Sequence, residues 1–464
     1  ASSDPRLERL HSNVAWSQRD NFVSLPTDCP QRDERLGWTG DAQAFAPTAS
    51  TLFDVESFWM SWLRDLEIDQ DASGAVAAVV PNILNDENPV GDDWITMGRA
   101  GWADAATIVP WAVYESYGSD EVLVRQLDSM RRWVASLEAR GDDDGLLPTE
   151  FQFGDWLDPD APGDKPWEAK VSSDFVANAF FARSARLLAN AERLVGDGAR
   201  ADRADLLADR VATATWDRWG ADAVETQTGA AIALEFGIAP DAERRRIGEG
   251  LARNVRDERG RIATGFLGTP LVLHALVDAG HVDEAYLMML RLEAPSWLYQ
   301  VEMGATTIWE RWDALAPDGT IHTGEMATDD SSGMLSFNHY AYGAVVDWIY
   351  RYVGGIAPTV DRPGYRRVIV APRPATGITW AKASVESRLG TVSIDWRMNG
   401  ADLEISLEIP YGADAELDLP LTDDSTVSLD REPYAGALLG PGEHRLVVTA
   451  ARVADPASLI AVAH

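Results

Sequence analysis

The feature that most constrains the fold is a change in hydrophobic period near residue 354. From about residue 40 to residue 353, apolar residues recur at three- and four-residue spacing, which is typical of helices packed on one face. The pattern predicts about ten helices, over 44–69, 103–117, 121–138, 173–195, 201–216, 228–236, 242–256, 269–279, 282–292 and 333–353. Because no heptad repeat accompanies them, we expect paired helices in layers or a ring rather than a coiled coil.

After Gly354 and Gly355 the period changes to two. The segments 391–398 and 401–409 flank Asn399-Gly400, which predicts a hairpin with these two residues as its turn, and 445–450 predicts a further strand. The sequence therefore predicts a mainly helical domain over 1–355 and a β-sandwich over 356–464.

Composition narrows the class of partner. Asp and Glu number 74 against 40 Lys and Arg, a formal net charge of -34, which repels nucleic acids and anionic membranes and favours neutral ligands. The single cysteine, Cys29, excludes an internal disulfide and a multi-thiolate metal site, and we interpret it as a packed residue. No run approaches the roughly 20 apolar residues of a membrane span, and no secretion signal is visible. We expect a soluble protein, either cytoplasmic or secreted with the cytoplasm favoured, of undetermined oligomeric state.

The segment from Asp28 to Asp41, DCPQRDERLGWTGD, combines carboxylates, arginines and an indole among prolines and glycines. The prolines and glycines predict a loop rather than a helix face. Carboxylates that bond hydroxyls and a ring that stacks on a pyranose are what a sugar site requires. An ion-paired surface loop would have the same composition, so both interpretations stay open at this point.

A second acidic and aromatic segment, GATTIWERWD, runs from Gly304 to Asp313. Glu310 lies between Trp309 and Trp312, and an acid between indoles is expected to be partly desolvated, which would raise its pKa. The alternative is an ion pair between Glu310 and Arg311 on the surface.

Three further loops, 91–94 (GDDW), 101–104 (GWAD) and 154–158 (GDWLD), also place Asp beside Trp. Loops that recur in this way between helices predict the rim of one pocket.

Hydrolysis of a glycosidic bond needs two carboxyl groups, one protonated and one ionised, and the candidates are Glu34 and Glu310. The residues alone do not decide which of the two donates the proton.

Four segments carry a resemblance to a known family: 21–43 (NFVSLPTDCPQRDERLGWTGDAQ), 101–111 (GWADAATIVPW), 304–313 and 336–345 (SFNHYAYGAV). Over nearly the whole chain they resemble the bacterial α-L-rhamnosidases of glycoside hydrolase family 78. The resemblance implies an (α/α)6 toroid followed by a C-terminal β-sandwich. It also implies an exo-acting, inverting hydrolase that releases terminal non-reducing α-L-rhamnose from rhamnosides or polysaccharides without a cofactor or metal. Many similar members carry β-domains before the toroid, so the chain is expected to be a fragment or a minimal member.

The resemblance also implies roles for individual residues. Glu34 would be the general acid and Glu310 the general base, with their carboxyl groups roughly 6.5 to 9.5 Å apart. The residues expected to contact the sugar are Asp28, Arg32 and Asp41 at its hydroxyls, Trp38, Trp102 and Trp156 along its apolar side, and His339 from the last helix. Asp104 and Asp155 are weaker candidates for the sugar site, because bracing a loop would equally explain each of them. Two alternatives stay open: a toroid glycosidase for another sugar, and a non-catalytic rhamnose-binding protein.

Overall fold

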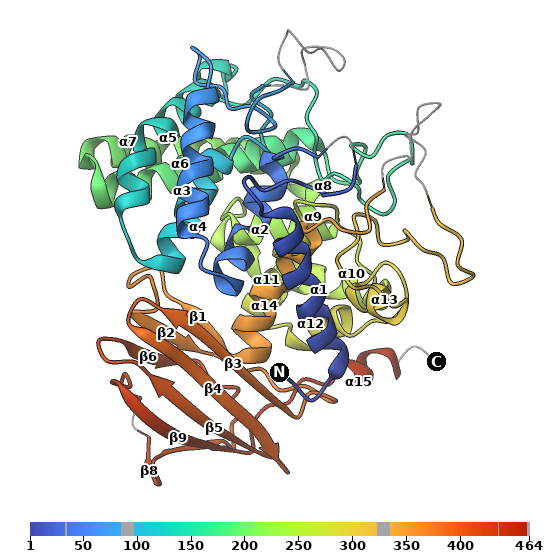
Figure 1. Cartoon of the computed structure of the whole chain (residues 1–464), viewed down its shortest axis with the longest axis vertical. Coiled ribbons are helices and arrows are strands. Elements are labelled where there is room, and N and C mark those ends of the chain that lie inside the picture. The colour runs from blue at the N-terminus through green and yellow to red at the C-terminus, as the bar shows by residue number, and fades with distance from the viewer. Residues whose placement is uncertain (33–34, 85–96, 323–334, 435, 462–464) are drawn as a thin grey trace.

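A computed structural model of the chain shows a helical domain followed by a domain of β-strands (Figure 1). It describes residues 1–32, 35–84, 97–322, 335–434 and 436–461. No helix within these ranges is long and apolar enough to cross a membrane. The predicted change from helices to strands is confirmed, because β1 begins at Ile356. The division of the chain into domains at residues 355 and 356 stays a prediction.

Most helices begin and end close to the predicted positions. The predictions over 44–69 and 333–353 are wrong in part, because the first segment is two helices and the described part of the second is helical only from Ala341. The helices Pro5–Asn21, Ala221–Ala223, Trp297–Glu302 and Pro456–Ala461 were not predicted. The α-helices are α1 (Pro5–Asn21), α2 (Thr39–Leu52), α3 (Glu56–Asp69), α4 (Ala105–Tyr117), α5 (Glu121–Arg140), α6 (Ser173–Val195), α7 (Gly198–Thr215), α8 (Ala221–Ala223), α9 (Gln227–Glu235), α10 (Asp241–Asp257), α11 (Thr269–Asp278), α12 (Val282–Met289), α13 (Trp297–Glu302), α14 (Val345–Trp348) and α15 (Pro456–Ala461). The π-helix η2 (Trp216–Gly220) links α7 to α8, and the 3-10 helix η3 (Ala341–Ala344) and the π-helix η4 (Ile349–Gly354) flank α14.

Two of these differences have local physical reasons. The prediction of one helix over 44–69 is wrong, because Phe53 is extended and the chain turns from an inner helix, α2, to an outer one, α3. The link between α2 and α3 is short, and apolar residues keep their helical spacing on both sides of it, so the sequence pattern does not reveal the break. Helix α1 was not predicted, although Asp4 caps it by accepting from Arg6 N and Pro5 occupies its first turn, both of which are start signals for a helix.

Six helical segments form a closed inner ring. α2 contacts α4, α4 contacts α6, α6 contacts α9, α9 contacts α11, α11 contacts α14, and α14 returns to α2. The helices α3, α5, α7, α10 and α12 each pack on an inner helix from outside, and Val14 of α1 lies against Gly343. Thr48 closes the ring, because its hydroxyl donates to Ala344 O at 2.9 Å and accepts from Asp347 N at 3.1 Å. The predicted (α/α)6 architecture is confirmed.

The topology of the ring places the loops that carry the predicted acidic and aromatic residues at one end. Because each outer helix returns the chain, the inner helices run in the same direction, and the loops before them open on the same side. Trp38 immediately precedes α2, Asp104 immediately precedes α4, and the segment 335–340 leads into η3 and α14. The predicted convergence of successive loops therefore follows from the topology.

The C-terminal domain contains two sheets. One has the order β3-β4-β5-β9-β7-β8 and the other has the order β1-β2-β6. The strands are β1 (Ile356–Pro358), β2 (Arg367–Val370), β3 (Trp380–Ser387), β4 (Gly390–Asn399), β5 (Asp402–Ile409), β6 (Asp414–Leu417), β7 (Thr426–Leu429), β8 (Glu432–Pro433) and β9 (Gly442–Thr449).

The hairpin between β4 and β5 is confirmed, but its turn lies one residue later than predicted. Asn399 pairs with Asp402, so Gly400 and Ala401 form the turn, and Gly400 has a φ of 64°, which favours glycine. This register places Trp396 opposite Ile405, and both side chains are buried. Matching of the apolar faces therefore fixes the register.

Asp104 joins three helices of the ring. Its carboxylate accepts from Gly101 N at 2.6 Å, from Trp133 Nε1 of α5 at 3.1 Å and from Ser184 Oγ of α6 at 2.5 Å. Burial raises the pKa of the Asp104 carboxyl, and the bonds from Ser184, Gly101 and Trp133 act in the opposite direction. The residue therefore braces the loop before α4.

We predict that Asp104→Ala destabilises the ring, because three donors lose their acceptor inside the protein. The expected loss is about 3 kcal/mol in the free energy of unfolding, measured by urea denaturation. Asp120→Ala is the matched control, because the Asp120 side chain is exposed and makes no capping bond at the start of α5. Equal midpoints for the two variants would contradict the bracing role.

Candidate active site

The segment that carries Glu310 is held on both sides by hydrogen bonds. Glu310 N donates to Ser336 O at 2.9 Å, and His339 N donates to Ile308 O at 2.7 Å, so this segment runs beside the one that leads into η3. Ile308 N also donates to Ser17 Oγ of α1 at 2.8 Å. The Glu310 side chain is 4% exposed. The expected desolvation of this acid is confirmed.

The charge partner of Glu310 is Arg32. Its Nη1 lies 2.9 Å from Glu310 Oε2, and its Nη2 lies 2.9 Å from Asp28 Oδ2. The alternative of a surface pair between Glu310 and Arg311 is wrong, since Arg311 Nε lies 3.3 Å from Asp313 Oδ1. One guanidinium therefore joins the loop at the start of the chain to the segment 278 residues later.

Asp28 orders the loop in which it lies. Its Oδ1 accepts from Leu36 N at 2.8 Å, and its backbone N donates to Leu36 O at 2.9 Å. The Cys29 thiol is buried and donates to Asp28 Oδ2 at 3.4 Å, which agrees with its interpretation as a packed residue. Gln31 Nε2 donates to Ser336 Oγ at 2.9 Å, a second link between the two segments.

Asp41 and His339 form a buried pair at the start of α2. His339 Nε2 lies 3.3 Å from Asp41 Oδ1, and the two side chains are 3% and 4% exposed. Burial, with a smaller effect from the charge of Arg32, holds the pKa of His339 well below its usual value. His339 is therefore neutral near pH 7. The ring of Phe266 packs on it with a centroid distance of 5.2 Å.

The three predicted tryptophans gather around Phe153. Its ring centroid lies 5.9 Å from Trp38, 4.7 Å from Trp102 and 5.9 Å from Trp156. Trp102 is buried, and a Cβ atom at Gly40 would lie 2.5 Å from its indole, so Gly40 is required for the ring to fit. Trp38 and Trp156 are partly exposed. These two rings are thus the members of the cluster that present a surface to solvent.

Asp155 braces the loop between Phe153 and α6. Its carboxylate accepts from Thr228 Oγ1 at 2.5 Å and from the backbone N of Gly265, Leu267 and Gly268 at 2.7 to 2.9 Å. Burial raises the pKa of Asp155 to about 6 despite these donors. The bonds hold the segment 264–268, and with it Phe266, against the loop of Trp156. These contacts favour the bracing alternative for Asp155.

The predicted site residues divide into two groups. The structure brings together Asp28, Arg32, Asp41, Glu310 and His339 as one network, with Trp38, Trp102 and Trp156 in the adjoining aromatic cluster. Glu34, its neighbour Asp33 and the GDDW loop at 91–94 lie outside the described residues. The separation of the Glu34 and Glu310 carboxyl groups therefore stays a prediction.

Sequence reasoning missed Phe153, Phe266 and Gln31. Phe153 directly precedes GDWLD, so its position beside an Asp-Trp loop was a usable signal. Phe266 stands between glycine and leucine without a nearby acid, and nothing in the local sequence marks it. Among the described residues, no group of three His, Cys, Asp or Glu side chains is placed to hold a metal ion.

This arrangement suits acid and base chemistry on a neutral polar ligand. A buried carboxylate with a cation beside it can accept a proton from a bound water, and a neutral imidazole with carboxylates can bond hydroxyls. Aromatic rings on one side can contact the apolar face of a sugar.

Comparisons with known proteins agree with this reading. Residues 1–353 match the model of the bacterial α-L-rhamnosidase six-hairpin glycosidase domain, and residues 355–432 match that of the bacterial α-L-rhamnosidase C-terminal domain. Two curated relatives are α-L-rhamnosidases. The one from Streptomyces avermitilis is 38% identical over 96% of this chain and 41% of the relative, and one from Formosa agariphila is 33% identical over 93% and 45%.

Solved structures give the same result. The Streptomyces avermitilis α-L-rhamnosidase complexed with L-rhamnose superposes with a TM-score of 0.85 at 36% identity, over 97% of this chain and 42% of that one. The Aspergillus terreus α-L-rhamnosidase gives a TM-score of 0.87 at 34% identity, over 97% and 50%. The chain thus spans less than half the length of these curated relatives. With both domain models matched in order, the chain belongs to the bacterial α-L-rhamnosidase family.

Proposed function

We propose that this protein is an exo-acting, inverting α-L-rhamnosidase that releases terminal non-reducing α-L-rhamnose from rhamnosides or polysaccharides. The observation that carries the proposal is the buried Glu310 carboxylate, joined through Arg32 to the loop that contains Glu34. Family membership supports the choice of L-rhamnose as the sugar.

The reaction is a single displacement. Glu310 accepts a proton from a water molecule as the water oxygen attacks the anomeric carbon, and Glu34 gives a proton to the glycosidic oxygen as the bond between that oxygen and the anomeric carbon breaks. The products are L-rhamnose with inverted configuration and the free alcohol of the leaving group. One carboxyl gains a proton and the other loses one, so proton exchange with solvent restores the enzyme.

Arg32 supports the role of Glu310 as a base. A base must be ionised before the reaction, and a buried carboxylate is costly without a compensating charge. The guanidinium provides that charge at 2.9 Å and also fixes the direction of the carboxylate. Its second bond, to Asp28, anchors the guanidinium itself to the ordered loop.

The aromatic cluster supports recognition of a deoxy sugar. The partly exposed Trp38 and Trp156 are apolar surfaces beside the polar network of Asp41 and His339. A 6-methyl group gains from contact with such a wall, whereas the 6-hydroxyl of mannose would be desolvated there without a partner. Equal hydrolysis of matched rhamnosides and mannosides would favour a toroid glycosidase for another sugar.

We predict that Glu310→Gln and Glu34→Gln each lower kcat on an aryl α-L-rhamnoside by about a thousandfold or more, because each removes one proton transfer. Glu302→Gln is the control, since Glu302 is exposed at the end of α13 a short distance before the base. Circular dichroism should report the same fold in all three variants. Turnover near that of the parent in both acid variants would reject the assignment. If the unmutated protein binds rhamnose in a calorimeter but hydrolyses no rhamnoside, it is a non-catalytic rhamnose-binding protein.

We predict that Arg32→Lys lowers kcat/KM by about a hundredfold, because one ammonium cannot replace the planar fork that holds Asp28 and Glu310 together. Arg35→Lys, an exposed position on the same loop, should leave kcat/KM unchanged. If Arg32 only stabilised the fold, Arg32→Lys would lower the melting temperature but keep kcat/KM in the pH range where Glu310 is ionised.

The stereochemical course and the exo action are tested together. Proton NMR of the first product should show the anomer opposite to that of the substrate, because the water attacks from the face opposite the leaving group. With a polysaccharide that carries terminal rhamnose, free rhamnose should appear from the first minutes without shorter oligosaccharides. Initial formation of the retained anomer, or early release of oligosaccharides, would contradict the respective part of the proposal.

A further inference from the structure

The segment 305–310, which ends at Glu310, has no regular secondary structure, so its backbone groups need partners from other elements. Ala305, Ile308 and Glu310 are buried, and solvent cannot replace a missing partner there. Backbone groups serve Ala305 N, Ile308 O and Glu310 N. Three others, Ala305 O, Ile308 N and Trp309 N, bond instead to side chains of α1 and α13. Side chains of neighbouring helices therefore help to place the backbone of Glu310.

Helix α1 carries a polar stripe, Arg9, Asn13 and Ser17, on the side that faces this segment. The three residues recur every four positions, so they lie along one face of the helix. Asn13 and Ser17 are 1% and 0% exposed, whereas an amphipathic helix usually buries apolar residues on such a face. Buried polar side chains are stable where they make hydrogen bonds, so the bonds of this stripe are its distinctive feature.

The stripe holds the beginning of the segment through one carbonyl group. Ala305 O accepts from Arg9 Nε at 3.1 Å, from Arg9 Nη2 at 3.0 Å and from Asn13 Nδ2 at 3.0 Å. Ala305 N donates to Gln300 O of α13 at 2.9 Å. Both polar groups of this peptide residue are thus fixed before the chain turns toward the base.

Ser17 holds the segment closer to Glu310. Ile308 N donates to Ser17 Oγ at 2.8 Å, and Ile308 O accepts from His339 N at 2.7 Å. The Ile308 side chain is fully buried. Ser17 therefore bonds to a residue that lies two positions before Glu310 and that is also joined to the backbone of His339.

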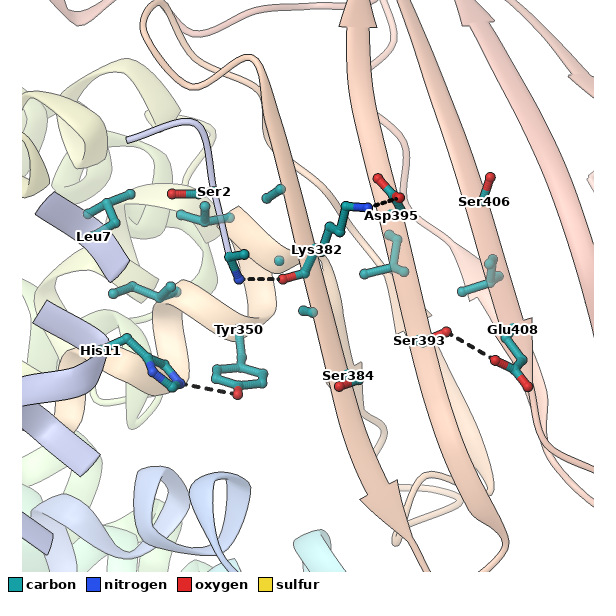
Figure 2. A pocket seen from close by; sticks show the side chains of 18 of the residues that line it. Ser2, Leu7, His11, Tyr350, Lys382, Ser384, Ser393, Asp395, Ser406 and Glu408 are labelled. Atoms are coloured by element: carbon teal, nitrogen blue, oxygen red, sulfur yellow. Dashed lines mark hydrogen bonds and ion pairs between the residues drawn. The ribbon is translucent and has the colours of Figure 1, made fainter. Parts of the chain in front are cut away.

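Helix α1 is itself held by other side chains. His11 Nε2 and Tyr350 Oη of η4 lie 3.3 Å apart, in the wall of a cavity of about 750 Å³ between the helical domain and the larger sheet (Figure 2). Gln18 Nε2 donates to Ala49 O of α2 at 3.1 Å. Because α1 is fixed to α2 and to η4, its stripe is a rigid support for the segment 305–310.

We propose that Ser17, supported by Asn13 and Arg9, is a positioning residue for Glu310. Its bond to Ile308 N fixes the backbone two residues before the carboxylate, and it acts through that backbone rather than on the sugar. The inference rests on the proposed function, in which Glu310 is the base. A base must lie within hydrogen-bond reach of the attacking water, and a displacement of about 1 Å costs a large factor in rate.

Positioning and simple stabilisation of the fold differ in their kinetic effects. Loss of the Ser17 bond leaves Trp38 and Asp41 in place, because they lie at the start of α2. Binding of the sugar should therefore persist while proton transfer to Glu310 slows. A lower kcat with little change in KM is the result that distinguishes a positioning residue from one that only stabilises the fold.

The test compares Ser17→Ala with the matched control Gln18→Ala. Each removes one buried hydrogen bond of α1, but the bond of Gln18 goes to α2 rather than to the segment 305–310. Both variants should melt at a lower temperature than the parent. Ser17→Ala should lower kcat on an aryl α-L-rhamnoside by about tenfold or more and keep KM within about twofold, whereas Gln18→Ala should keep both values.

Arg9→Met is the second variant, because Arg9 is exposed and its replacement leaves no buried cavity. It removes two of the three bonds to Ala305 O, and the bond from Asn13 remains. The expected loss in kcat is therefore smaller than for Ser17→Ala, about threefold. Parent values of kcat in both Ser17→Ala and Arg9→Met, or equal losses in Ser17→Ala and Gln18→Ala, would overturn the proposal.

Hydrogen exchange tests the same placement without activity. The amides of Trp309 and Glu310 should exchange about tenfold faster in Ser17→Ala than in Gln18→Ala, the factor that corresponds to about one net hydrogen bond. Equal exchange in the two variants would also overturn the proposal. A parent that hydrolyses no rhamnoside would reject the proposed function, and faster exchange in Ser17→Ala would then still show that Ser17 orders this segment, so the two failures are distinguishable.

Discussion

The bond network of Arg32 is the interaction on which the candidate active site depends. One guanidinium contacts Asp28, whose other oxygen orders the loop 28–36, and Glu310, whose backbone pairs with the segment leading to the last inner helix. A buried acid would otherwise favour its neutral form, which cannot act as a base. The same contact therefore positions the carboxylate and places a positive charge beside it, as the proposed chemistry needs, and it does so between two distant parts of the chain.

Two further buried acids, Asp104 and Asp155, stabilise the loops around this network. Asp104 and Asp155 each collect several donors from different helices or loops, and neither side chain is exposed to solvent. They hold the loops that carry Trp102 and Trp156 in place. Several donors of the protein surround each of these two carboxylates, which leaves them little capacity to bind a substrate.

Much of this architecture was predictable from the sequence, because a helical ring and a sheet differ in period. Ser173–Val195 was predicted to the residue, since its apolar face and its flanking loops are distinct. Glu310 was identified because indoles surround it in sequence. Its partnership with Arg32 was not predicted, since nothing local links two positions 278 residues apart. Phe266 was missed for the same reason, because its contact with His339 is created by the fold alone.

Ring closure by Thr48, Ala344 and Asp347 has a consequence for biosynthesis. Glu310 lies in a segment just before the last inner helix, and Asp28 and Arg32 lie just before the first. A nascent chain on the ribosome therefore carries Asp28 and Arg32 without Glu310 for most of translation. The buried network of Arg32 can therefore form only after the last inner helix has emerged and met the first, so the site is completed at the same step as the ring.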